Sequence, residues 1–183
     1  GTATSSNTSS KPISMSSASL PVFRTALSNL YHCLVKADAN AVARRFDPNV
    51  LVGARLAPDM LPLASQVRIA CDAAKYAAAR LGGLSAPRHE DNETTLDQLK
   101  ARIASTLDWL STVPPEAIDG SEERDITFPV GRDGSTRTMK GEAYLKHWAL
   151  PNLFFHVTTA YALLRHNGVE LGKADYLVGD EAP

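Results

Sequence analysis

The strongest constraint on the fold is a helical spacing of apolar residues that recurs along most of the chain. In four long stretches, apolar side chains return every three or four residues, and glycine or proline residues end three of these stretches. We expect helices at about residues 20–37, 58–81, 94–113 and 141–167, with long connections between them. Helices of this length bury their apolar faces against one another, so the sequence predicts a mainly α fold, a four-helix bundle.

A change of period separates the third and fourth predicted helices. Residues 124–130 and 135–139 are rich in β-forming side chains and flank a turn at 131–134, which is the pattern of a β-hairpin. Two strands alone are marginally stable, so we expect this small hairpin to rest on the helices. Within the last helix, Pro151 removes one backbone hydrogen bond and is expected to kink it.

The two ends of the chain differ from its middle. Eleven of the first nineteen residues are Ser or Thr, so burial offers little to offset the entropy of ordering them. We therefore expect a flexible tail over residues 1–19, a single helical-bundle domain over 20–177 and a C-terminal tail over 178–183. A chain of 183 residues is long enough to bury one core without disulfide or metal support.

Composition excludes several classes of partner. Nineteen Lys and Arg residues against twenty Asp and Glu give a net charge of −1, whereas nucleic-acid binders normally carry a basic excess, so we expect no nucleic-acid partner. The longest apolar run, Ala160 to Leu164, is far too short to span a membrane, so no membrane partner is expected either. No secretory signal pattern opens the chain, and we expect a cytoplasmic protein.

Cys33 and Cys71 match no zinc or disulfide pattern and are expected to be buried thiols.

Polar residues interrupt the apolar faces of two predicted helices. A helical wheel at 100° per residue places Asn152, His156 and Thr159 in the middle of the stripe of the last helix that should be buried. On the second predicted helix, Asp59 and Gln66 lie seven residues apart on an otherwise apolar arc. Burying such groups without partners costs roughly 1–3 kcal/mol each. We therefore expect them to bond to one another, hold water or face a cavity.

Two interpretations of this polar cluster remain open. In the first, the protein is a small-molecule enzyme, an isomerase, lyase or transferase without a redox cofactor, that transfers protons in a pocket between the second and last helices. The catalytic residues would be His156 and Asp59, and the ligand-binding residues would be Gln66, Asn152, Arg55 and Thr159. The alternative is a non-catalytic ligand-binding or homodimeric structural module, in which a polar network fixes the register of the helices.

Other polar and aromatic residues have ordinary explanations. Arg68, Asp72 and Lys75 share one arc of the second helix and are expected to form a solvated face. His89 lies in a polar loop among acidic residues and is expected to face solvent, and Phe155 is expected to fill the core.

Two stretches of the sequence resemble a known family. Residues 54–60 (ARLAPDM), followed by Gln66, and residues 149–161 (ALPNLFFHVTTAY) are similar to a domain of unknown function numbered nineteen-ninety-three. The resemblance extends over about residues 19–177. That family belongs with the DinB-like helical bundles, which implies an up-down-down-up arrangement of four helices.

The resemblance also implies something about metals. Many DinB-like proteins bind a divalent metal through three histidines, one on the second helix and two as H-x-x-x-H on the last, and some are thiol-dependent transferases or isomerases. The matching positions here are Gln66, Asn152 and His156, so amides replace two of the three imidazoles. Amides are poorer ligands for zinc or nickel than imidazole is. We therefore expect a degenerate metal site and no cofactor, and we assign no metal ligands. The alternative is that the site binds a divalent metal.

Overall fold

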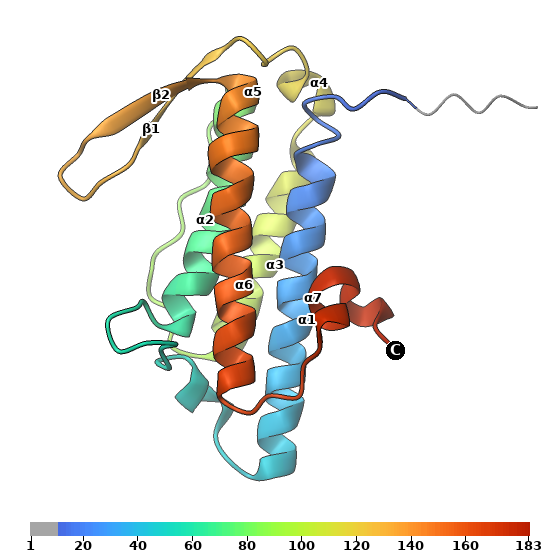
Figure 1. The fold of residues 1–183 in the computed structure, drawn as a ribbon, viewed down its shortest axis with the longest axis vertical. Helices are drawn as coiled ribbons and strands as arrows, with labels where there is room; N and C mark the ends of the chain where they lie inside the picture. Colours follow the sequence, from blue (N-terminus) through green and yellow to red (C-terminus); the bar gives the residue numbers. More distant parts are fainter. Residues whose placement is uncertain (1–10) are drawn as a thin grey trace, which may run out of the picture.

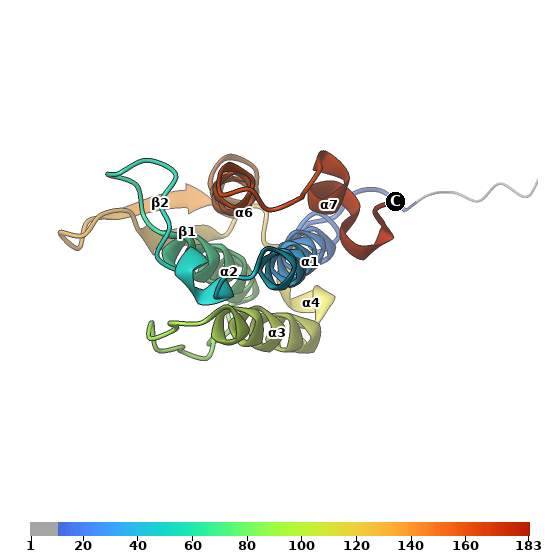
Figure 2. The ribbon, with the colours of Figure 1, turned by 90° about the horizontal axis from the view of Figure 1, so that it is seen from below.

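The computed structural model describes residues 11–183 and shows four long helices packed side by side (Figure 1). These are α1 (Leu20–Arg44), α2 (Leu63–Gly82), α3 (Leu96–Thr112) and α6 (Leu150–His166). In Figure 1, α1 and α6 run downwards while α2 and α3 run upwards, which is the predicted up-down-down-up order seen from the opposite end. Figure 2 shows α1 and α2 in the middle, with α6 on one side of them and α3 on the other. The predicted fold class is confirmed.

Short elements complete the chain. The hairpin consists of β1 (Asp125–Pro129) and β2 (Thr136–Lys140), which pair antiparallel. Phe128 of β1 packs against Tyr144 and Trp148, with ring centroids 4.9 Å apart in both pairs, so the hairpin rests on the helices as expected. The other short elements are η1 (Pro48–Leu51), α4 (Pro115–Ile118), α5 (Gly141–Tyr144), the π-helical η2 (Leu145–Ala149), α7 (Lys173–Val178) and η3 (Gly179–Glu181).

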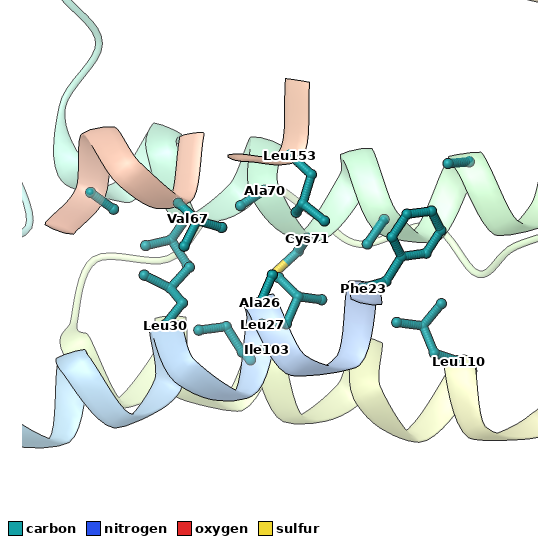
Figure 3. Packing of buried hydrophobic residues seen from close by; sticks show 14 of the residues in the cluster. Phe23, Ala26, Leu27, Leu30, Val67, Ala70, Cys71, Ile103, Leu110 and Leu153 are labelled. Atoms are coloured by element: carbon teal, nitrogen blue, oxygen red, sulfur yellow. The ribbon is translucent and has the colours of Figure 1, made fainter. Parts of the chain in front are cut away.

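The core lies where the four long helices meet. Figure 3 shows Phe23 and Leu27 of α1 beside Cys71 of α2, with Ile103 of α3 and Leu153 of α6 closing the same cluster. Each fully buried side chain of the size of Leu or Phe contributes roughly 1.5–3 kcal/mol to folding. The inner faces of α1 and α2 therefore hold the bundle together.

Two helix boundaries differ from those predicted. α1 continues to Arg44 in a single helix. α2 begins at Leu63 rather than near Pro58, because Pro62 at its N-cap disfavours helical backbone in the residue before it. Asp59 therefore lies in the loop before α2 and not on the helical arc where the wheel placed it, which corrects that prediction.

Residues that were predicted to belong to the tails form part of the fold. Met15 is only 5% exposed and packs into the core, and the backbone N–H of Ser16 donates to Asp119 Oδ1 at 2.9 Å. Gly179, beyond the predicted domain end, is also buried. The ordered fold thus extends past both predicted boundaries, while the prediction for residues 1–10 lies outside the described residues.

The helix that contains Pro151 absorbs the proline through a π-helical turn. Leu145–Ala149 forms this turn, in which the N–H of Leu150 donates to the carbonyl of Leu145. A proline provides no N–H and crowds the carbonyl four residues before it, and a wider turn relieves both problems. As Figure 1 shows, α5, η2 and α6 therefore continue as one helical rod.

The arc of α2 that was predicted to be solvated is covered instead. Lys75 is 0% exposed, and its Nζ lies 3.0 Å from His89 Nδ1 and 3.4 Å from Asp72 Oδ1. Buried Arg102 of α3 contacts Asp72 and Glu93, each at 3.0 Å. The cause is topological: α2 and α3 are parallel, so residues 83–95 must run back along the bundle and cover this arc.

None of the helices within residues 11–183 combines the length and the apolar character that a membrane crossing requires.

Candidate functional site

One direct contact joins the polar residues of α2 and α6. His156 Nδ1 lies 2.7 Å from Gln66 Oε1. Gln66, in the first turns of α2, is 2% exposed, whereas His156, in the middle of α6, is half-buried. The two helices lie side by side, as both views of the fold show. The expectation that these residues bond to each other is met for this pair.

The hydrogen bonds of Gln66 determine which nitrogen of His156 carries the proton. Gln66 Nε2 donates to the carbonyl of Leu61 at 3.2 Å, which turns its Oε1 towards the imidazole. An amide oxygen accepts hydrogen bonds and cannot donate, so His156 Nδ1 must be the donor. In the neutral ring, Nε2 then has a free lone pair. No hydrogen-bond partner of Nε2 is found among residues 11–183.

Burial favours this neutral form of the ring. Removal of His156 from water lowers its pKa below the ordinary value of 6.5, because a charged imidazolium is poorly stabilised where solvent is excluded. Nε2 of His156 is therefore an available proton acceptor at neutral pH.

The other polar residues of α6 lie beside the buried face rather than in its middle. The middle is formed by Leu153, Val157 and Ala160. Asn152 is half-buried and Thr159 is buried. The regular wheel was wrong here because it ran through the π-helical turn, in which each turn holds an extra residue.

The structure does not bring Asp59 or Arg55 into contact with His156. Both side chains are exposed in the loop before α2. Arg55 Nη1 donates to the carbonyl of Met60 at 2.5 Å, and no ion pair of Asp59 occurs within the described part of the chain. The loop nevertheless touches the site, since Leu61 holds the Gln66 amide.

An aromatic side chain that sequence reasoning assigned to the core lies beside the imidazole. Phe155 is 55% exposed, and its ring stands edge-on to that of His156 with centroids 5.0 Å apart. Sequence reasoning missed this because a wheel at 100° per residue places Phe155 within about 40° of Thr159, at the edge of the stripe that was predicted to be buried. His156 and Phe155 thus lie together at a partly exposed surface, with the Phe155 ring as its apolar part. Five hollows found among residues 11–183 have neither Gln66 nor His156 in their walls.

Comparison with known proteins places the chain in a family. The sequence matches the model described as Domain of unknown function (DUF1993) over residues 15–177. The chain belongs to this family. The structure is also similar to the crystal structure of a DinB family member protein from Shewanella denitrificans, at 41% sequence identity and a TM-score of 0.80. That similarity covers 88% of this chain and 90% of the other. No curated protein matches the sequence significantly.

The side chains of this DUF1993 member do not fit the three-histidine metal set that its resemblance to DinB-like proteins implied. Gln66 Oε1 already accepts the proton of His156 Nδ1, and Asn152 offers only a second amide. Within residues 11–183, no three His, Cys, Asp or Glu side chains are grouped so that they could hold a metal ion. The chemistry derived for this site is therefore that of its own side chains.

Proposed function

We propose that this DUF1993 protein is a small-molecule enzyme in which His156 accepts and returns a proton, without a redox cofactor. The observation that supports this proposal is the 2.7 Å contact from His156 Nδ1 to Gln66 Oε1. A general base needs a fixed orientation, an unprotonated nitrogen and access to the substrate. The Gln66 amide supplies the first two, and partial exposure of the ring supplies the third.

The residues around the imidazole define what the substrate would resemble. Phe155 provides an apolar edge next to the proton acceptor. Asn152 lies one turn before His156 on the same helix, where its amide would bind a carbonyl or hydroxyl oxygen of the substrate. Thr159 would add a hydroxyl. We infer a small substrate with an acidic C–H, O–H or S–H bond next to a polar oxygen, which suits an isomerase, a lyase or a transferase.

The loop before α2 would supply the remaining roles. In this proposal Arg55 binds an anionic group of the ligand, and Asp59 is the second catalytic residue. Both side chains are exposed, and the loop that carries them contacts Gln66 through Leu61.

A second candidate function is a non-catalytic module that binds a ligand or a second copy of the chain through this surface. The exposed apolar side chains Phe155 and Leu61 favour it, because covering them would bury apolar area.

Exchange of substrate hydrogen for deuterium separates the two candidates even while the substrate is unidentified. Purified protein is incubated in D₂O with a panel of small carbonyl, hydroxy and thiol compounds, and deuterium incorporation is measured by mass spectrometry. Catalysed exchange should appear with the wild type and fall by about 100-fold or more in His156→Gln. It should persist in His147→Gln, a matched change of an exposed histidine on the same helical rod. Absence of exchange in the wild type, or its persistence in His156→Gln, would support the non-catalytic module.

The protonation state can be tested independently by ¹⁵N NMR of the histidine rings. His156 should carry its proton on Nδ1 and should titrate below pH 6.5, since burial lowers its pKa. A neutral ring protonated on Nε2 would contradict the mechanism.

A further inference from the structure

A hollow between α1 and α3 is separate from the Gln66–His156 pair. Its volume is about 510 Å³, which lies in the range of small-molecule binding sites. Tyr31 and Asn29 line it from α1, Leu107 and Asp108 from α3, and Asp180 from η3. Two long helices and the C-terminal segment therefore converge around one space.

The charges around this hollow are all of one sign. Asp108 and Asp180 are exposed carboxylates, and neither forms an ion pair with any described residue. No Lys or Arg side chain is among the residues that line the hollow. The space therefore favours a positively charged occupant.

The side-chain oxygen of Asn29 is a further acceptor at the same place. Asn29 is 7% exposed, and its Nδ2 donates to the carbonyl of Tyr176 at 2.9 Å, which fixes the orientation of the amide. Its Oδ1 has no hydrogen-bond partner among residues 11–183. This oxygen faces Gly179, where an added Cβ would overlap it, so the glycine keeps the oxygen uncovered beside Asp180.

His32 provides a further acceptor in the wall. Its Nε2 donates to the carboxylate of Asp175 at 2.8 Å, and this carboxylate also accepts from Lys36. In the neutral ring, Nδ1 therefore has a free lone pair. The Ser28 and Tyr31 hydroxyls can donate or accept, and the other polar groups placed around the hollow offer it acceptors, which favours an occupant with several donors.

We propose that this hollow binds a primary ammonium group carried on a small apolar or aromatic body. An ammonium has three N–H donors and no acceptor, which matches two carboxylates and the Asn29 oxygen in number and in sign. The Tyr31 ring and Leu107 form the apolar wall, and an aromatic ring also attracts a cation through its face. A metal ion fits less well, since the described residues provide no group of three metal-binding side chains here.

Titration with three ligands of one shape but different charge tests this proposal. The probes are 2-phenylethylamine, 2-phenylethanol and phenylacetate, added to the ¹⁵N-labelled full chain at pH 7 and followed by amide chemical shifts. The amine should bind at least tenfold more tightly than the alcohol, and phenylacetate should not bind. The shifts should cluster at Asn29–His32, Leu107–Asp108 and Gly179–Glu181.

Matched charge changes separate a local site from general attraction. Asp108→Asn and Asp180→Asn should each weaken binding of the amine by about tenfold, a typical loss for one charge-assisted hydrogen bond. Glu116→Gln removes the same charge from an exposed residue outside the hollow and should leave binding unchanged.

Several outcomes would overturn the proposal. These are equal binding of the alcohol, an equal loss in Glu116→Gln, shifts located elsewhere, or no binding of the amine. Ca²⁺ is added in a separate titration, and its binding at the same residues in preference to the amine would assign the hollow to a metal instead. None of these results depends on whether His156 transfers protons.

Discussion

Replacing Asp175 by asparagine should loosen the attachment of the C-terminal segment to α1. The Asp175 carboxylate is buried and accepts hydrogen bonds from the Gly172 amide and His32 Nε2, both at 2.8 Å, and from Lys36 Nζ at 3.1 Å. Burial by itself would raise the pKa of this carboxyl. The three donors outweigh burial and lower the pKa from 3.8 to about 2.

The size of the effect follows from this pKa. A carboxyl whose pKa falls from 3.8 to about 2 on folding stabilises the folded state by about 2 kcal/mol at neutral pH. The Lys36 side chain is 41% exposed, so solvent screens part of this, and we expect about 1–2 kcal/mol. Because the folded-state pKa is depressed, the stabilisation is complete above about pH 5 and is lost as the pH falls through 4 towards 2.

Urea unfolding followed by circular dichroism measures the difference. Asp175→Asn should be less stable than the wild type by about 1–2 kcal/mol at pH 7, and this gap should shrink at pH 3. Glu181→Gln, which changes an exposed carboxylate of the same segment, should leave stability within about 0.5 kcal/mol of the wild type. Equal stability of Asp175→Asn and the wild type at pH 7, or a gap that stays constant down to pH 3, would refute the reasoning.

Two further predictions concern the tightly packed Gly141 and the two buried cysteines. Gly141→Ala should lower the free energy of unfolding measured in urea by at least about 2 kcal/mol, because the new Cβ would overlap the backbone oxygen of Ser121. Gly53→Ala has free space around the new Cβ and should be nearly neutral. Similar losses of stability in the two variants would contradict this reasoning. Burial raises the pKa of Cys33 and of Cys71 to about 12, so both thiols stay protonated at pH 8. They should react with a disulfide reagent at least about 100-fold more slowly in the folded protein than in guanidinium, and rapid labelling of the folded chain would show that they are accessible.

The parts of the fold that were predicted correctly are those specified by local signals. The start of α3 is one example: a helix was predicted from about residue 94, and α3 begins at Leu96 after Thr95, whose Oγ1 caps it by accepting a hydrogen bond from the N–H of Gln98 at 3.1 Å. The hairpin is another, since its turn and its alternation lie within a few residues of each other. The contact between Gln66 and His156 could be anticipated because both are polar residues on apolar faces.

The parts that were missed depend on distant segments or on irregular backbone. Nothing near Lys75 in the sequence indicates burial, because residues 83–95 cover it only when two parallel helices require a long return connection. Asp59 was misplaced because Pro62 delays the start of α2. The wheel of α6 failed because a period of 3.6 residues does not hold through η2.

The π-helical turn at Leu145–Ala149 has a consequence for relatives of this chain. It holds about one residue more than an α-helical turn over nearly the same rotation, so the segments before and after it keep their relative setting about the helix axis. Deleting a single residue there would restore ordinary α-helical hydrogen bonding and leave everything downstream nearly unrotated relative to Tyr144. Such a deletion would keep the imidazole of His156 beside Gln66, although its position in the sequence would fall by one. Alignments of family members should therefore allow a gap at this turn before histidines are compared.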